Sequence, residues 1–211
     1  MKSKLKCATF YGIVDLGYVK PERVAEVARG LIEGGAGVVQ LRAKGVAKEE
    51  VEELAKELQE VCREGGVPFI VNDYPEIALR VGADGVHIGQ DDGSLAGVRE
   101  VVGDEMIVGR STHSPAQAEE AMLEGFDYIG FGPLFPTPTK QGRPGIGMQD
   151  VARVQSLVGG KIPVFCIGGV RRDNLSEVVA AGAKRVVVVS DVLLADSVCE
   201  ASSEVVRKLN E

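Results

Sequence analysis

Polar and charged residues, together with one pair of glycines, recur in this sequence at the ends of short apolar runs. They are Gln40, Arg42 and Lys44; Asn72 and Asp73; His87, Gln90, Asp91 and Asp92; Ser111 and His113; Thr137, Thr139 and Lys140; Gly168 and Gly169; and Ser190. Residues of these types bind anions and metal ions and transfer protons. If the apolar runs are the parallel strands of a barrel, their carboxyl ends meet at one mouth and these side chains form one site.

Two carboxylates and three cationic side chains of this set could lie close together. The carboxylates are Asp73 and Asp92, and the cations are Arg42, Lys44 and Lys140. Mg2+ takes one or two carboxylates and completes its octahedron with water and phosphate oxygens, so the set favours a metal-bound diphosphate. The same charges could also form ordinary surface ion pairs. Periodicity does not tell whether Asp92 or the adjacent Asp91 faces inward.

A second anion site is predicted where the seventh and eighth runs end. Gly168 and Gly169 form a turn that can expose backbone N–H groups, and Ser190 stands where a following helix can begin. Barrel enzymes often bind a phosphate on such groups. The alternative is that the glycines only permit a tight turn and that Ser190 is a simple helix cap.

The two histidines lie at different positions relative to the apolar runs. His87 lies within an apolar run, which favours a packed or hydrogen-bonded side chain over a catalytic one. His113 follows the fifth run, where it either transfers a proton or braces a loop. The chain has no Ser–His–Asp arrangement, no histidine cluster and no G-x-x-x-x-G-K-S/T loop, so hydrolase and nucleotide triphosphatase functions lack support.

The apolar runs alternate with segments of helical periodicity. We predict strands at residues 11–15, 38–42, 68–71, 85–88, 106–109, 128–131, 163–167 and 185–189. Helical stripes lie between them, at Val24, Val27, Ala28, Leu31 and Ile32 and at Val51, Leu54, Ala55, Leu58 and Val61. This repetition predicts an α/β fold, a (β/α)8 TIM barrel. A doubly wound dinucleotide-binding sheet needs G-x-G-x-x-G after the first strand, and residues 15–18 do not match it.

Length and composition agree with this fold. At 211 residues we expect a single barrel domain over 1–211, in which the one long irregular stretch, 132–147, is functional. The net charge of −7 argues against nucleic-acid partners. The four cysteines form no C-x-x-C pair, and we expect them to be reduced core thiols. No apolar run suits a signal peptide or membrane span, so we expect a cytoplasmic protein without a membrane partner.

Five segments, taken together, resemble the thiamine phosphate synthase family. They are Gln40-Leu-Arg-Ala-Lys44, Val71-Asn-Asp73, Ala83-Asp-Gly-Val-His-Ile-Gly-Gln-Asp-Asp92, Gly130-Phe-Gly-Pro-Leu-Phe-Pro-Thr-Pro-Thr-Lys140 and Ile167-Gly-Gly169. The resemblance runs in order from about Tyr11 to Leu194. Any one segment alone would be weak, since many phosphate-binding barrels share the Ile-Gly-Gly turn.

The resemblance implies two groups of substrate-binding residues and a metal site. Aminopyrimidine diphosphate would be bound by Gln40, Arg42, Lys44, Asn72, Ser111 and Lys140, of which Arg42, Lys44, Ser111 and Lys140 would act in catalysis. Thiazole phosphate would be bound by Thr137, Thr139, Gly169, Val189 and Ser190. Mg2+ would be held by Asp73 and Asp92, the family's pattern choosing Asp92 over Asp91.

The implied reaction displaces diphosphate from the pyrimidine methylene carbon by the thiazole nitrogen, giving thiamine phosphate. Two alternatives remain. Thiazole tautomerases of the same superfamily use a histidine, and the segment around His113 would suit one, although Asn72, Asp73, Asp92 and the Thr-Pro-Thr-Lys loop would then be unnecessary. A non-catalytic phosphate-binding barrel would leave the metal pair and the cations idle. The sequence does not indicate an oligomeric state.

Overall fold

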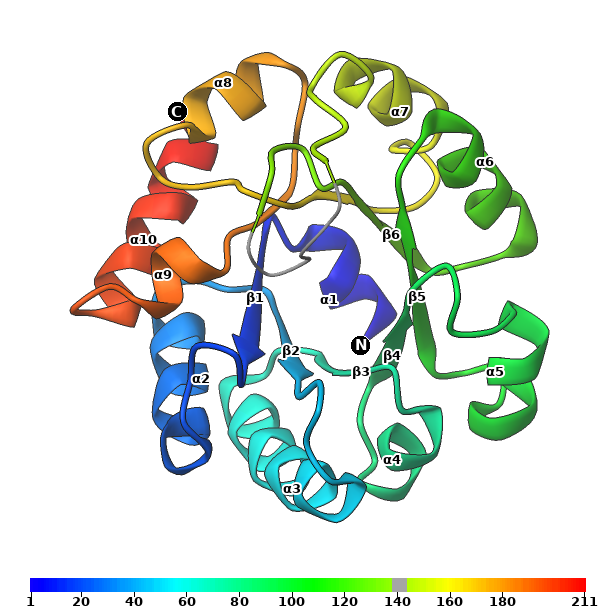
Figure 1. Ribbon diagram of the computed structural model, residues 1–211, viewed down its shortest axis with the longest axis vertical. Coiled ribbons are helices and arrows are strands. Elements are labelled where there is room, and N and C mark those ends of the chain that lie inside the picture. The colour runs from blue at the N-terminus through cyan, green and yellow to red at the C-terminus, as the bar shows by residue number, and fades with distance from the viewer. Residues whose placement is uncertain (138–143) are drawn as a thin grey trace.

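The computed structural model describes residues 1–137 and 144–211, which contain a closed barrel of eight parallel strands in chain order (Figure 1). The strands are β1 Phe10–Asp15, β2 Val38–Arg42, β3 Phe69–Asn72, β4 Gly85–Ile88, β5 Ile107–Thr112, β6 Tyr128–Phe131, β7 Val164–Cys166 and β8 Val186–Val187. The pairing of Phe10 with Val186 joins β1 to β8 and closes the ring. The predicted (β/α)8 fold is confirmed.

Helices surround the barrel, as predicted, except for the first, which closes one end (Figure 1). They are α1 Lys2–Cys7, α2 Val24–Glu33, α3 Lys48–Gly65, α4 Pro75–Arg80, α5 Leu95–Val102, α6 Pro115–Glu124, α7 Val151–Leu157, α8 Leu175–Ala180, α9 Ser190–Leu193 and α10 Val198–Leu209, with a 3-10 turn, η1, at Pro21–Arg23. The apolar stripes of α2 and α3 are largely buried. The sequence order Ser114, Pro115 and Gln117 predicts a helix start, and Ser114 caps α6 by accepting a hydrogen bond from the Gln117 amide.

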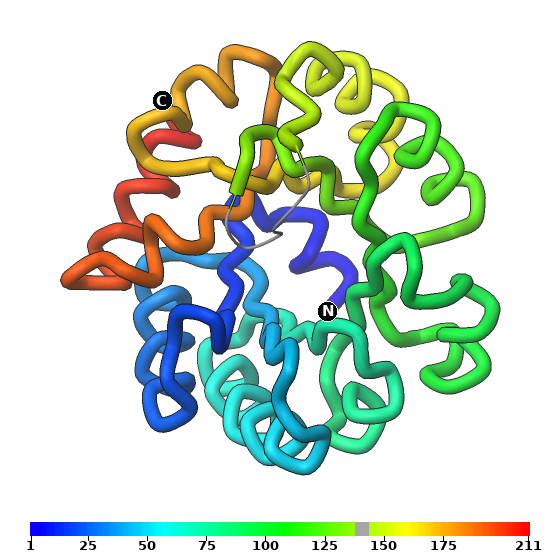
Figure 2. The backbone as a smooth tube through the Cα atoms, viewed as in Figure 1, coloured from blue at the N-terminus to red at the C-terminus, as the bar shows by residue number. Residues whose placement is uncertain are grey.

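The core has two parts, one on each side of the strands. The larger lies between the strands and the surrounding helices. The smaller fills the barrel itself and includes Leu5, Tyr11, Ile70, Tyr128 and Phe165. Leu5 belongs to α1, which crosses the middle of the ring in Figures 1 and 2 and closes one end of the barrel. The opposite end is therefore the one open to a ligand.

Several local predictions need correction. β5 extends to Thr112, so Ser111 lies within this strand and not after it. Cys62 and Cys166 are buried, but Cys7 is exposed and Cys199 is half-buried, so only two of the four thiols lie in the core. The spacing of Asn174 and Glu177 predicts a capping box, but the Asn174 side chain does not cap α8 and instead accepts a hydrogen bond from the Arg171 amide at 2.8 Å.

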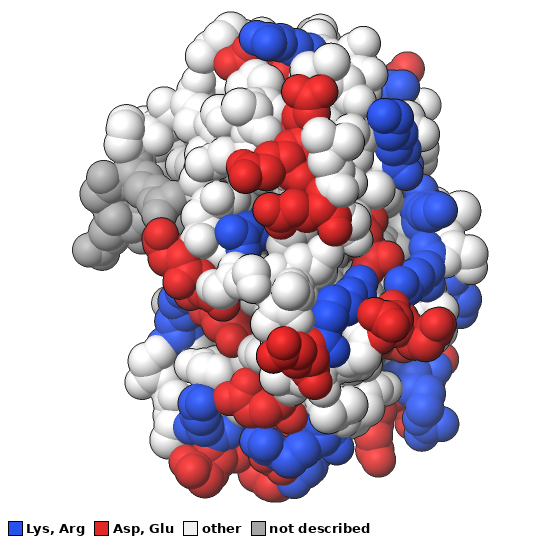
Figure 3. Space-filling model, turned by 90° about the vertical axis from the view of Figure 1, so that its right-hand side faces the viewer, with Lys and Arg blue, Asp and Glu red and all other residues white. Residues whose placement is uncertain are grey.

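The charges on the surface are mixed in sign. On the face shown in Figure 3, acidic and basic side chains alternate without a broad area of either sign. Exposed pairs of this kind contribute little individually to stability. Among the described residues, no helix combines the length and apolarity needed to cross a bilayer.

Candidate active site

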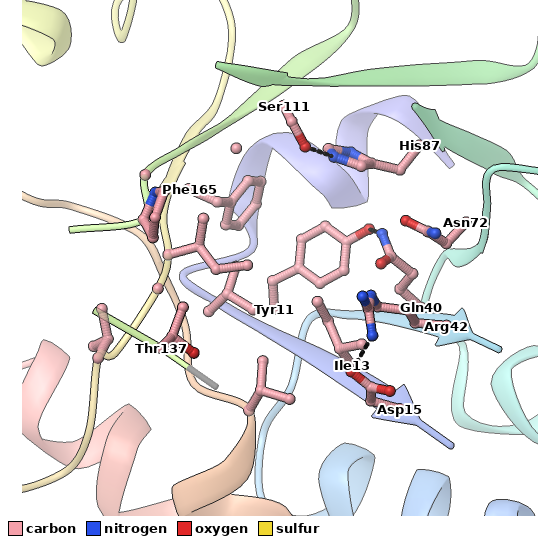
Figure 4. A pocket seen from close by; sticks show the side chains of 18 of the residues that line it. Tyr11, Ile13, Asp15, Gln40, Arg42, Asn72, His87, Ser111, Thr137 and Phe165 are labelled. Atoms are coloured by element: carbon pink, nitrogen blue, oxygen red, sulfur yellow. Dashed lines mark hydrogen bonds and ion pairs between the residues drawn. The ribbon is translucent and has the colours of Figure 1, made fainter. Parts of the chain in front are cut away.

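A pocket opens at the carboxyl ends of the strands, where the polar residues were predicted to meet. Eight of the predicted site residues line it: Gln40, Arg42, Asn72, Ser111, Thr137, Gly169, Val189 and Ser190. Figure 4 shows that Gln40, Arg42, Asn72 and Ser111 approach it from one side and Thr137 from another. Between them lie apolar and aromatic side chains, among them Ile13, Tyr11 and Phe165. The pocket thus combines two polar regions with an apolar floor.

Arg42 is held by a carboxylate that the sequence analysis did not single out. Asp15, at the end of β1, accepts a hydrogen bond from the Arg42 guanidinium at 2.7 Å and is only 1% exposed. Its other oxygen accepts from the Gly17 amide at 2.9 Å. The register of β1 and β2 pairs Asp15 directly with Arg42. The ion pair therefore fixes a cation at the wall of the pocket.

Lys44 and Asp73 form a second ion pair, with their charged atoms 2.9 Å apart. Neither they nor Asp92 is among the residues that line the pocket. Asp73 adopts a left-handed backbone conformation with φ of 67°, uncommon for a residue other than glycine. Its amide donates to the His87 carbonyl at 2.9 Å, which fixes this conformation to β4. Such backbone outliers cluster at functional sites.

The carboxylates of Asp73 and Asp92 lie close enough to influence each other. Burial raises the pKa of Asp73, Lys44 opposes this rise, and the neighbouring Asp92 carboxylate adds to it. A divalent cation would relieve this repulsion, and carboxylate oxygens are ligands that Mg2+ accepts. The donor set therefore fits Mg2+ at these two residues, although the described residues contain no cluster of three or more potential metal ligands.

The loop that carries Asp92 is tied to β5. Asp92 accepts a hydrogen bond from the Gly89 amide at 2.8 Å. The Gln90 amide group donates to the Ser111 carbonyl at 2.6 Å, and Arg110 donates to the carbonyls of Gly93 and Gln90 at 2.6 and 3.2 Å. These bonds hold the loop against the strand. Arg110 thus braces this loop against β5.

Both histidines line the pocket, but each is engaged. His87 contacts Tyr128 and Ser111 through its two ring nitrogens, at 3.1 and 3.0 Å. This agrees with the predicted hydrogen-bonded role. His113 contacts the Gly132 carbonyl through Nδ1 and so braces the start of the next loop.

The second polar region lies where the loop after β6 meets the turn after β7. The amides of Leu134 and Phe135 donate to the carbonyls of Ile167 and Gly168, both at 2.9 Å. Gly169 lines the pocket in a left-handed conformation, and Ser190 is the first residue of α9. Thr139 and Lys140 lie outside the residues that the structure describes.

Comparisons with known proteins identify the family of the chain. The sequence model of a family described as thiamine monophosphate synthase matches residues 10–192. The chain belongs to this family. A thiamine-phosphate synthase from Gloeobacter violaceus is 38% identical over all of this chain, which spans 60% of that longer protein. One from Bacillus cereus is 44% identical, covering 88% of this chain and 85% of its own length.

A solved structure of the same family has the same fold. Thiamine phosphate pyrophosphorylase from Pyrococcus furiosus is 35% identical, with a TM-score of 0.86 over 99% of this chain and 97% of its own. Family membership makes this chain a transferase with thiamine phosphate synthase activity.

Proposed function

We propose that this synthase joins hydroxymethylpyrimidine diphosphate to a thiazole phosphate, or its carboxylated form, in the pocket at the carboxyl end of the barrel. The observation that carries the proposal is that one pocket has two polar regions separated by an apolar floor. Two phosphorylated rings that must react with each other require such an arrangement, because each anion needs its own binding groups while the rings meet between them.

The diphosphate half is assigned to the side of the pocket formed by β2 to β5. Gln40, Asn72 and Ser111 line this side and offer hydrogen-bonding groups to the pyrimidine and its diphosphate. Arg42, anchored by Asp15, and Lys44 would neutralise the phosphate charge. Lys140, outside the described residues, is assigned the same role by family resemblance.

The thiazole phosphate is assigned to the opposite side. Thr137, Gly169 and Ser190 line the pocket there, and Val189 adds an apolar contact. Backbone N–H groups at a glycine turn suit a phosphate monoester. Thr139 completes this group by resemblance.

In the reaction, the bond between the pyrimidine methylene carbon and the diphosphate oxygen breaks, and its electrons leave with diphosphate. The thiazole nitrogen then donates its lone pair to the carbon. We propose that departure precedes attack, so that the pyrimidine is briefly cationic. Arg42, Lys44 and Lys140 stabilise the charge that grows on the departing diphosphate. Mg2+ held by Asp73 and Asp92 would supply further charge neutralisation of the diphosphate.

Incubation of the purified protein with both phosphorylated substrates and Mg2+ tests this function. We expect thiamine phosphate and diphosphate in equal amounts, and neither when one substrate is omitted. Loss of Mg2+ to a chelator should stop the reaction. If the protein released diphosphate without forming thiamine phosphate, the proposed joining step would be wrong.

Two alternatives are less well supported. A tautomerase has no use for the cation and carboxylate set around Asp73, and His113, its proposed proton carrier, braces a loop through the Gly132 carbonyl. A non-catalytic phosphate-binding barrel would not need Asp15 to anchor Arg42 at the pocket wall. A single domain over residues 1–211, a cytoplasmic location, and the absence of nucleic-acid or membrane partners stay predictions.

A further inference from the structure

Five side chains that line the pocket form a continuous chain of hydrogen bonds. They come from five different strands: Gln40, Tyr11, Tyr128, His87 and Ser111. Gln40 Nε2 lies 2.9 Å from the Tyr11 hydroxyl, which lies 2.9 Å from that of Tyr128. His87 Nδ1 is 3.1 Å from the Tyr128 hydroxyl, and His87 Nε2 is 3.0 Å from Ser111 Oγ. Figure 4 shows the Tyr11 hydroxyl pointing toward Gln40, and His87 beside Ser111.

The middle of this chain is buried in the barrel. Tyr11 and Tyr128 are 2% and 1% exposed, and burial raises the pKa of both phenols, so each keeps its proton. The ring of Tyr128 lies against Gly109, where an added Cβ would come within 2.1 Å of Tyr128 Cζ. Glycine at this position of β5 therefore makes room for the ring. His87 is half-buried, and all five members of the chain line the pocket, with Gln40 and Ser111 at its two ends.

The direction of the chain follows from its first member. An amide NH2 can only donate, so the Tyr11 hydroxyl accepts from Gln40 and has its single hydrogen for Tyr128. Tyr128 in turn donates to His87 Nδ1. A neutral imidazole that accepts at Nδ1 carries its proton at Nε2, and this proton is donated to Ser111 Oγ. The Ser111 hydroxyl hydrogen is then available to the pocket, as is the carbonyl oxygen of Gln40.

We propose that Tyr11, Tyr128 and His87 are positioning residues that fix the hydrogen-bond polarity of the two pocket residues at the ends of their chain. Gln40 then presents an acceptor and Ser111 a donor. This step rests on the proposed function. The Gln40 acceptor suits an amino group on the pyrimidine, which donates, and the Ser111 donor suits a diphosphate oxygen, which accepts. If the hydrogen bonds ran the other way, Gln40 would present its NH2 group and Ser111 a hydroxyl lone pair. These groups would repel the pyrimidine amino group and the diphosphate oxygen.

The tautomer of His87 gives a test that does not depend on catalysis. The chain has only two histidines, so nitrogen NMR of protein labelled on the histidine rings, with a His113→Asn variant for assignment, resolves His87. We expect Nε2 protonated and Nδ1 unprotonated in the ligand-free protein. In Tyr128→Phe, which removes the donor to Nδ1, this fixed tautomer should give way to a mixture. A wild-type protein with the proton on Nδ1 would overturn the proposal.

Kinetics give a second test. In His87→Gln the side-chain amide nitrogen lies near the position of Nε2 and can still donate to Ser111. In His87→Asn the shorter side chain reaches only the position of Nδ1 and cannot donate to Ser111. We expect His87→Asn and Tyr128→Phe to lower kcat/KM for the pyrimidine diphosphate by about tenfold or more, and His87→Gln to retain most of it. KM for thiazole phosphate should change by less than about twofold in all three.

The two tests separate this proposal from the proposed function. A wild-type protein with the expected tautomer but no thiamine phosphate formation would contradict the function and leave the hydrogen-bond direction established. An active wild-type enzyme in which His87→Asn and His87→Gln lose equal activity, or in which the KM values for both substrates rise together, would contradict the positioning role. Circular dichroism of each variant distinguishes such losses from unfolding.

Discussion

At the scale of single residues, Asp91 and Asp92 are adjacent carboxylates on the loop after β4, so a substitution at one serves as the control for the other. Asp92 influences the pKa of Asp73, and its carboxylate is fixed by the Gly89 amide. We predict that Asp92→Ala raises the Mg2+ concentration needed for half-maximal rate on the order of 100-fold, because a charge contact worth a few kcal/mol is lost. Asp91→Ala is the control and should change it little. Equal effects at both positions, measured by Mg2+ titration of the rate, would exclude this assignment.

Arg42 and its buried partner lead to a second residue-scale prediction. Arg42→Ala should slow bond breaking on the order of 100-fold in single-turnover experiments, because its charge stabilises the departing diphosphate. Asp15→Asn should slow it about tenfold by leaving Arg42 poorly anchored. Asp173→Asn breaks the exposed pair with Arg171 and serves as the control. If the Asp15 variant matched the wild type while Arg42→Ala did not, the anchor would be dispensable.

The sequence predicted the pocket residues better than it predicted their contacts. Polar residues at strand ends were identifiable because a parallel barrel brings those ends together. The pairing of Asp15 with Arg42 depends on strand register, which the sequence does not specify. Tyr11 and Tyr128 look like ordinary core aromatics in sequence, and only their meeting inside the barrel reveals a hydrogen-bonded chain.

At the scale of elements, Leu134 and Phe135 after β6 pack against the turn after β7. A substitution at Gly169 in this turn should therefore affect stability more than a substitution at Ser190. A Cβ added at Gly169 would lie 2.6 Å from Phe135 Cβ, and its φ of 66° is unfavourable for alanine by about 1–2 kcal/mol. Gly169→Ala should therefore disturb this packing and lower stability. Ser190→Ala removes only a hydroxyl.

We predict that Ser190→Ala raises KM for thiazole phosphate and leaves that for the pyrimidine diphosphate unchanged. The reason is that Ser190 and Gly169 line the pocket from the segments after β8 and β7, whereas Ser111 lines it from β5. Steady-state kinetics with each substrate varied in turn measures both constants. Ser111→Ala should show the reverse pattern. A rise in the pyrimidine constant alone for Ser190→Ala would reverse our assignment of the two regions.

The elements were predicted most accurately where apolar periodicity was uninterrupted. All eight strands were placed, but β5 was ended too early because Arg110, Ser111 and Thr112 are polar. In the structure these residues face the pocket or bond to neighbouring backbone, so polarity there marks the site and not the end of the strand. Helix α1 was missed because its six residues bury only Leu5.

At the scale of the whole molecule, ionisable groups are buried on both sides of the strands. Burial raises the pKa of the Cys62 thiol on α3 and of the Cys166 thiol on β7, each to about 12, and the Tyr11 and Tyr128 phenols are shifted in the same direction. The pKa of an unfolded thiol is about 8.5. Between these two pKa values the unfolded chain loses thiol protons that the folded protein retains. The free energy of unfolding is therefore highest below the pKa of the unfolded thiol and falls as the pH rises above it.

We therefore predict that the free energy of unfolding falls as pH rises above about 9, by about 1.4 kcal/mol per pH unit for each buried thiol that ionises on unfolding. Urea unfolding at about pH 8 and about pH 10.5 measures this loss. The double variant Cys62→Ala/Cys166→Ala should start less stable, because it contains cavities, but lose stability less steeply with pH. Cys7→Ala removes an exposed thiol and should keep the wild-type slope. If the double variant lost stability as steeply as the wild type, the thiols would not contribute to the alkaline transition, and the buried phenols would have to account for it.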